Sequence, residues 1–276
     1  MDKIRLIASD MDATLLDEQS QLPADFEETI HTLAELGIRF APASGRPLYT
    51  LEELFPTLRD ELVFIGDNGG AIRWKGQNLF TSEMSPEGWR ALNRLTREQG
   101  DIAVLCGLES AYVERPFAVH DAVLRHFYTK IEYVDRLEDV AAPADKFTIY
   151  LPQHNAQQAY DTVYASQRSI YSIAVAGECW VDIMNPGVHK GAALQTLGQL
   201  WDLPSESMMA FGDTYNDAEM LTTAKYGFLM ENGSGPLRAQ VPFLAPSHRE
   251  YGVMQVLKQV LRQNGEVSSE DFTKAH

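Results

Sequence analysis

Apolar runs and amphipathic segments alternate along the first third of the chain, and this alternation limits the fold more than any other feature. Apolar runs at 4–9, 38–44 and 62–66 predict buried strands, and the segments at 24–37 and 46–55 predict helices between them. A strand–helix–strand order with helical crossovers implies a parallel sheet. We therefore expect an α/β protein.

A stretch with a different pattern of predicted elements, at about residues 83–185, interrupts this alternation. Helical segments there separate short strands, and 172–185 predicts a hairpin, which is typical of an inserted α+β unit. The alternation then resumes with expected helices and strands at 188–201, 207–212, 216–224, 226–230 and 252–263. We expect a core formed by 1–82 and 186–265, an inserted domain at 83–185, and a flexible tail at 266–276, because the end of the chain is polar and aperiodic.

Composition narrows the classes of partner. The net charge of −16, without a basic tract, argues against nucleic acid or an anionic membrane as partner. A small anionic substrate would need local positive charge from a metal ion, a lysine or backbone N–H groups. No apolar stretch reaches the roughly 18 residues of a membrane span, and charges run through the N-terminus, so we expect a cytoplasmic protein. No protein partner is indicated.

Two carboxylates one residue apart follow the first predicted strand, in the sequence DMDATLLD at 10–17. Asp10 and Asp12 would repel each other in an extended segment unless a cation or a shared proton relieves the repulsion. Asp and Thr are also common in turns and caps, so the pair alone has a structural interpretation. A Mg²⁺ ion, which prefers oxygen ligands, would remove the repulsion.

Three further polar groups lie at other predicted strand–helix junctions, and each could also serve as a turn or a helix cap. Ser44 and Gly45 offer a hydroxyl and an unobstructed N–H at an expected helix start, which suits an anion. Lys190, in the first turn of a predicted helix, becomes favourable if an anion lies between it and the sheet. The segment FGDTYND adds two carboxylates and an amide: Asp213, Asp217 and Asn216.

Together these four groups predict a site at one edge of the sheet, because open parallel sheets bind ligands beyond the carboxyl ends of their strands. They supply a metal site, a phosphate cradle, and a nucleophile with its acid. If each group served only as a turn or a helix cap, four unrelated structural features would have to occur at the same edge of the sheet by chance.

At these residues the chain resembles the haloacid dehalogenase-like phosphatase superfamily. Its motifs occur in family order as DMDAT, Ser44, Lys190 and GDTYND, and IGDNGGAI together with the insertion points to the Cof-type subfamily with a large α/β cap. The resemblance covers all but the tail and implies a Rossmann-like core split by a cap domain. It also implies a phosphatase for small phosphorylated metabolites, with sugar phosphates as the first guess.

The resemblance further implies individual roles. Asp10 would be the nucleophile and Asp12 the general acid/base, with Mg²⁺ held by Asp10, the main-chain carbonyl of Asp12, and Asp213. The phosphate- or substrate-binding residues would be Ser44, Gly45, Lys190 and Asn216, and the supporting residues Thr14 and Asp217.

Three positions depart from the family pattern, one of them His189, which precedes Lys190 where a small polar residue is more common. Ala13 stands where the family has glycine, which suggests ordinary backbone angles in this loop. Asp182 stands where glutamate is common. Substrate choice is expected to depend on the cap, where Arg115, His120 and Trp180 are candidates, although each also has a structural or surface interpretation.

Three other functions stay open at this stage. A sugar phosphomutase would use the same aspartyl-phosphate intermediate. A receiver-like signalling domain also phosphorylates an aspartate, although the length of the chain and Asp12 argue against it. A non-catalytic phosphometabolite binder is the third.

Overall fold

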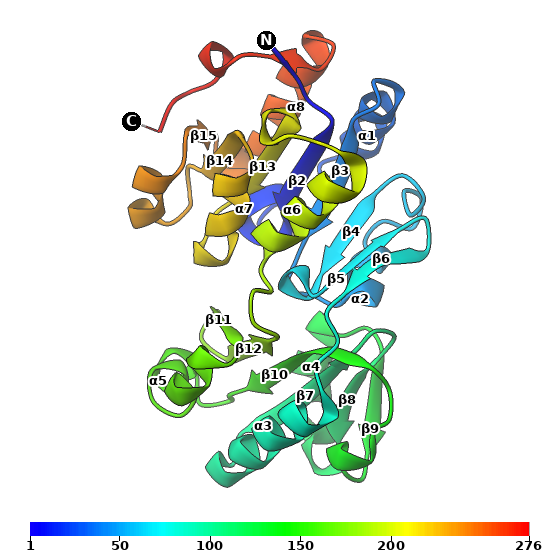
Figure 1. Cartoon of the computed structure of the whole chain (residues 1–276), viewed down its shortest axis with the longest axis vertical. Coiled ribbons are helices and arrows are strands. Elements are labelled where there is room, and N and C mark those ends of the chain that lie inside the picture. Colours follow the sequence, from blue (N-terminus) through cyan, green and yellow to red (C-terminus); the bar gives the residue numbers. More distant parts are fainter. Residues whose placement is uncertain (276) are drawn as a thin grey trace.

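The computed structural model describes residues 1–275, which form two large sheets and one small one. Figure 1 shows the core sheet in the upper half of the molecule and the cap sheet in the lower half. The chain crosses between them twice, after Thr81 and after Met184. No helix among the described residues is both long enough and apolar enough to span a bilayer.

The core sheet is mainly parallel. Its strands are β2 (Leu6–Asp10), β3 (Arg39–Ala43), β4 (Val63–Gly66), β5 (Ala71–Trp74), β6 (Gln77–Thr81), β13 (Met208–Gly212), β14 (Tyr226–Met230) and β15 (Phe243–Ala245). They lie in the order β15-β14-β13-β2-β3-β4-β5-β6. Pairs from β15 to β4 are parallel, and β5 and β6 add an antiparallel hairpin at one edge.

Helices cover both faces of this sheet. One face carries α1 (Phe26–Glu35), α2 (Leu48–Glu53) and α8 (Gly252–Arg262), and the other carries α6 (Lys190–Trp201) and α7 (Ala218–Thr223). Within β2, Ile7 packs into the first layer, while Leu6 and Ala8 pack into the second. Burial on both faces explains why the strands are continuously apolar. The predicted parallel α/β core is confirmed.

The cap is an α+β unit, as predicted. Its strands are β7 (Ile102–Gly107), β8 (Ala111–Glu114), β9 (Ile131–Val134), β10 (Ala144–Tyr150), β11 (Ser172–Ala176) and β12 (Trp180–Met184), in the order β11-β12-β10-β7-β8-β9. One face packs against α3 (Pro86–Gln99) and α5 (Ala156–Asp161), and the other against α4 (Asp121–Phe127).

Local sequence signals set the limits of α3. The Ser85 hydroxyl caps its start by accepting a hydrogen bond from the Gly88 N–H at 3.1 Å, and Pro86 occupies the first turn. Gly100 ends the helix with a φ of 76°. Signals in the rest of the cap are weaker, and the short parallel strand β9 was not anticipated.

The flexible tail expected at 266–276 is wrong for the residues that the structure describes. Strand β16 (Glu266–Val267) pairs with β1 (Asp2–Lys3), and Val267 is fully buried. The ring of Phe272 packs edge-on against Phe228, with centroids 5.0 Å apart. Val267 and Phe272 lie five residues apart, a spacing that fits neither a helix nor a strand. Periodicity alone could therefore not identify them as buried residues. His276 lies outside the described residues.

The parallel strands end at one edge of the core, facing the cap. Their last residues are Asp10 in β2, Ala43 in β3, Gly66 in β4 and Gly212 in β13. The predicted groups that follow these strands are therefore brought to the same edge, as the parallel topology requires.

We expect Phe272→Ala to destabilise the protein by about 3 kcal/mol, because the ring fills a buried aromatic cluster on the core. Urea unfolding followed by circular dichroism measures the loss. Glu270→Ala, on the exposed side of the same segment, should change stability by less than about 0.5 kcal/mol. Equal stability of Phe272→Ala and the wild type would show that the segment does not support the core.

Candidate active site

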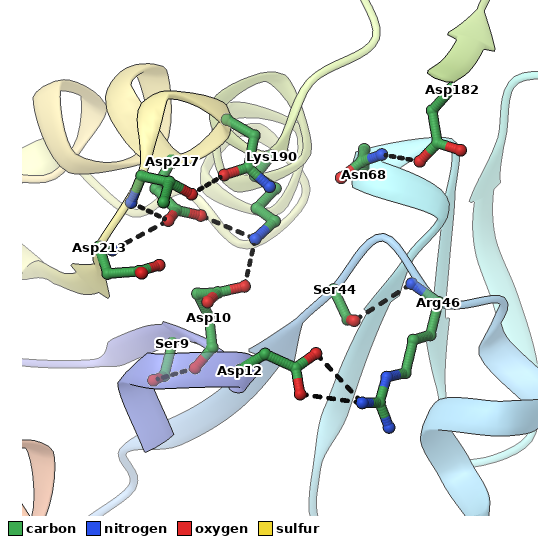
Figure 2. A network of polar contacts seen from close by, with 12 residues as sticks. Ser9, Asp10, Asp12, Ser44, Arg46, Asn68, Asp182, Lys190, Asp213 and Asp217 are labelled. Carbon is green, nitrogen blue, oxygen red and sulfur yellow. Dashed lines mark hydrogen bonds and ion pairs between the residues drawn. The ribbon is translucent and has the colours of Figure 1, made fainter. Parts of the chain in front are cut away.

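Asp10, the last residue of β2, lies at the centre of a buried ionic cluster (Figure 2). The Lys190 Nζ donates to Asp10 Oδ1 at 2.5 Å and to Asp217 Oδ1 at 2.7 Å. Lys190 is the first residue of α6, where His189 caps the helix by accepting from the Ala192 N–H at 3.1 Å. A lysine opposing the helix dipole is thus compensated by two carboxylates of the protein itself.

Asp217 anchors the loop that follows β13. Its Oδ2 accepts hydrogen bonds from the backbone N–H groups of Asp213 at 3.0 Å and Thr214 at 3.2 Å. Both oxygens of Asp217 are therefore engaged, one by Lys190 and one by the loop. This arrangement fixes the loop that carries Asp213.

Burial, together with the neighbouring carboxylates, raises two pKa values in the cluster. Burial raises the pKa of Asp10 to about 8, and the charges of Asp217 and Asp213 add to this rise, against the attraction of Lys190. Burial, with Asp217 beside it, raises the pKa of Asp213 to about 6. A cation near Asp10 and Asp213 would stabilise the ionised forms, which a nucleophilic carboxylate needs.

The donor set suits Mg²⁺. One carboxylate oxygen from each of Asp10, Asp213 and Asp217 lies within 4.8 Å of the others. Because both oxygens of Asp217 already accept hydrogen bonds, Asp10 and Asp213 supply the more available oxygens. An all-oxygen, anionic set is what Mg²⁺ prefers.

Asp12 lies in a different environment from Asp10. Its side chain is 55% exposed, and its two carboxylate oxygens accept from Arg46 Nη2 at 2.9 and 3.1 Å. Figure 2 shows Asp12 turned toward Arg46 and away from the Lys190 cluster. Separate cations thus hold the two acids apart, and Asp12 keeps access to solvent.

Ser44 and Gly45 form a tight loop after β3. The Ser44 hydroxyl accepts a hydrogen bond from the Arg46 N–H at 3.1 Å, and the Ser44 main-chain carbonyl accepts one from the Asn68 N–H at 2.9 Å. Helix α2 begins only at Leu48, so the expected position at a helix start is wrong, and any anion would be held by the loop. At Gly45 a side chain would crowd Asn68, since an added Cβ would lie 3.1 Å from its Oδ1.

A cleft of about 650 Å³ lies between core and cap. The core lines it with Asp10, Asp12, Ala13, Ser44, Gly45, Arg46, Pro47, Asn68, Asp213, Thr214 and Asn216. Thr14 is buried and does not line it, and Lys190 and Asp217 lie behind Asp10. All the predicted residues with direct roles are thus at or just beneath one cleft.

A model of the family described as haloacid dehalogenase-like hydrolase matches residues 7–257. The chain belongs to this family. It is 32% identical over 263 residues to the 5-amino-6-(5-phospho-D-ribitylamino)uracil phosphatase YbjI of Escherichia coli K12, covering 94% of this chain and 97% of that protein. It is 31% identical over 249 residues to the HMP-PP phosphatase of Cronobacter sakazakii, covering 87% and 89%.

A solved structure from Streptococcus mutans UA159 superposes with a TM-score of 0.86 at 29% identity, covering 94% of this chain and 99% of that one. The predicted haloacid dehalogenase-like fold with a cap is confirmed. Because its relatives are phosphatases, this haloacid dehalogenase-like hydrolase is a phosphoric monoester hydrolase. The receiver-like and non-catalytic hypotheses lose their support.

Several cleft residues were not anticipated as site residues, among them Arg46, Asn68 and Lys146. Arg46 directly follows the predicted phosphate loop, so its position was a usable signal. Asn68 belongs to the family pattern IGDNGGAI but carries no obvious role by itself. Lys146 lies in the middle of a cap strand, and nothing in its local sequence indicates a partner 101 residues away.

The hydrolase departs from our expectation at Ala13, whose φ is +58° rather than an ordinary negative value. The Asn232 Nδ2 donates to the Ala13 carbonyl at 2.9 Å and holds the loop in this conformation. A left-handed conformation costs a residue with a Cβ about 1–2 kcal/mol. The family's glycine thus marks a real backbone requirement, which alanine meets under strain.

We expect Ala13→Gly to raise the free energy of unfolding by up to about 1 kcal/mol, since relief of strain exceeds the roughly 0.5–1 kcal/mol cost of glycine's flexibility. Activity should stay within about tenfold of wild type. Urea unfolding and steady-state assays measure both. Ala34→Gly, inside α1, is the matched control and should lose about 1 kcal/mol; a similar loss at Ala13 would contradict this account.

Proposed function

We propose that this hydrolase is a Mg²⁺-dependent phosphatase that cleaves small phosphate monoesters through an aspartyl-phosphate on Asp10. The observation that carries the proposal is the pair of carboxylates with separate partners, Asp10 on Lys190 and Asp12 on Arg46, beside one cleft. Asp10 is buried and held in one position, as a nucleophile needs, whereas the side chain of Asp12 is 55% exposed and can exchange a proton with solvent.

In the first step a carboxylate oxygen of Asp10 attacks phosphorus, and the ester P–O bond breaks. Asp12 gives its proton to the leaving alkoxide. In the second step a water molecule attacks phosphorus, Asp12 takes its proton, and the bond between phosphorus and Asp10 breaks. The products are an alcohol and inorganic phosphate, and both aspartates return to their starting forms.

Other residues bind the phosphoryl group in this proposal. The Ser44 hydroxyl, the Gly45 N–H and the Lys190 ammonium would contact its oxygens, and Asn216 the substrate. Asp10, Asp213 and the main-chain carbonyl of Asp12 would hold Mg²⁺, which supplies positive charge opposite the phosphoryl oxygens. Asp217 and Thr14 would support the two loops from below.

We expect Asp10→Asn to lower kcat by at least about 10³-fold, because the amide cannot form the phosphoenzyme. Hydrolysis of p-nitrophenyl phosphate and of a panel of phosphorylated metabolites measures this, with phosphate release separating a phosphatase from a phosphomutase. Chelation should abolish the wild-type activity and Mg²⁺ restore it. Exposed Asp60→Asn is the control. Unchanged turnover by Asp10→Asn would refute the proposed nucleophile.

The cap side of the cleft carries an aromatic wall, formed by Phe127, Tyr128 and Trp180. The Trp180 ring centroid lies 5.0 Å from that of Phe127 and 6.3 Å from that of Tyr128, so the three rings pack against one another. Of the other expected specificity residues, Arg115 pairs with Asp135 at the surface, and His120 packs against Tyr150. Neither lines the cleft.

An aromatic wall suits a leaving group with a flat ring, since rings stack on aromatic side chains. The name of the Escherichia coli relative describes such a compound, a phosphorylated ribityl chain attached to uracil. We propose the same general shape here: a polyol or sugar phosphate next to the carboxylates, with a planar ring against the wall. This keeps the sugar-like phosphate expected from the sequence and adds the ring.

We expect Trp180→Ala to lower kcat/KM on the order of tenfold for 5-amino-6-(5-phospho-D-ribitylamino)uracil, since base stacking contributes about 1–3 kcal/mol. For ribose 5-phosphate, which has no flat ring, the change should be under about threefold. Trp74→Ala, in the core hairpin away from the cleft, is the matched control. Equal losses on both substrates would contradict a ring-binding wall.

A further inference from the structure

Two paired strands of the cap present polar side chains to the core. In the antiparallel pair β10–β12, Thr148 lies opposite Asp182 and Lys146 lies opposite Met184. Because side chains alternate along a strand, Lys146 and Thr148 share one face, while Phe147 and Ile149 pack into the cap core. The polar face therefore borders the cleft, where Lys146 and Asp182 line its wall.

Lys146 reaches across to the predicted phosphate loop. Its Nζ donates to the Gly45 carbonyl at 2.5 Å and lies 3.1 Å from Asp67 Oδ1 and 3.5 Å from Asp182 Oδ2. The side chain is only 2% exposed. A buried ammonium needs its charge and its donors satisfied, so these partners hold it in one place.

Asp182 reaches the same loop through Asn68. Its Oδ2 accepts from Asn68 Nδ2 at 2.8 Å, and its Oδ1 accepts from the Thr148 hydroxyl at 2.7 Å (Figure 2 shows the Asn68 contact). Asn68 has a φ of +55°, and its Oδ1 would lie 3.1 Å from a Cβ added at Gly45. The cap thus acts on the loop in two ways, directly at the Gly45 carbonyl through Lys146 and indirectly through the Asn68 side chain that Asp182 holds.

We propose that Lys146 and Asp182 are positioning residues that make the phosphate-binding conformation of the Ser44–Gly45 loop depend on the seating of the cap. This rests on the proposed function, in which the Gly45 N–H binds phosphate. A cap that moves away takes Lys146 and the anchor of Asn68 with it, and the loop then loses both constraints. Phosphate affinity is therefore high with the cap seated and low with the cap displaced, which couples product release to cap opening.

The variants Lys146→Met and Asn68→Gly remove one contact each. Methionine keeps much of the length of the lysine side chain without its donors, and glycine keeps the positive φ of Asn68 without its amide. Inorganic phosphate is tested as a competitive inhibitor of p-nitrophenyl phosphate hydrolysis with Mg²⁺ present. Its inhibition constant measures how well the Ser44–Gly45 loop binds phosphate. We expect each variant to raise the phosphate inhibition constant and KM by a similar factor, about tenfold. Exposed Lys3→Met should change neither.

Folding is checked by circular dichroism and Tm before the assay. Lys146→Met leaves Asp67 and Asp182 without their cation and could fail to fold for that reason. In that case the phosphate inhibition constant of Asn68→Gly alone tests the inference. Folded variants whose phosphate inhibition constants stay within twofold of wild type would overturn the inference. A wild type that hydrolyses no ester would instead contradict the proposed function, and phosphate binding by calorimetry would still test the loop.

Discussion

The buried bridge from Lys190 to Asp10 and Asp217 is the interaction on which the rest of the site depends. It joins the end of β2, the start of α6 and the loop after β13, three elements that are far apart in the sequence. Removing one partner from such a bridge leaves an unpaired buried charge, which costs several kcal/mol. The bridge therefore fixes where the nucleophile lies and also ties together the two halves of the split core.

The remaining features distribute charge around this bridge. Arg46 holds Asp12 apart from the cluster, so the two acids have different partners although only one residue separates them. Asp213 carries the carboxylate that the loop leaves available for a cation. On the cap side, Lys146 repeats the same principle, a buried ammonium among carboxylates, but directs it at the loop backbone.

The sequence was sufficient to predict those parts of the fold and site that depend on residues close together in the chain. Alternating apolar runs predicted the core, and the positions of Asp10 and Lys190 at predicted strand–helix junctions indicated that they meet at one edge of the sheet. It was insufficient where the signal is long-range. Two partners of Lys146, Gly45 and Asp67, lie in the other domain. The packing of Phe272 follows no helix or strand period, and the positive φ of Ala13 is maintained by Asn232, 219 residues away. Only the folded chain shows these contacts.

The central claim, that Asp10 becomes phosphorylated, is tested most directly in an Asp12→Asn variant. A good leaving group such as p-nitrophenol needs no proton from Asp12, so the first step should proceed, whereas hydrolysis of the intermediate loses its base. Acid quenching followed by mass spectrometry should then find phosphate on the peptide that contains Asp10. Failure to detect phosphorylated Asp10, while the wild type hydrolyses the same ester, would contradict the account.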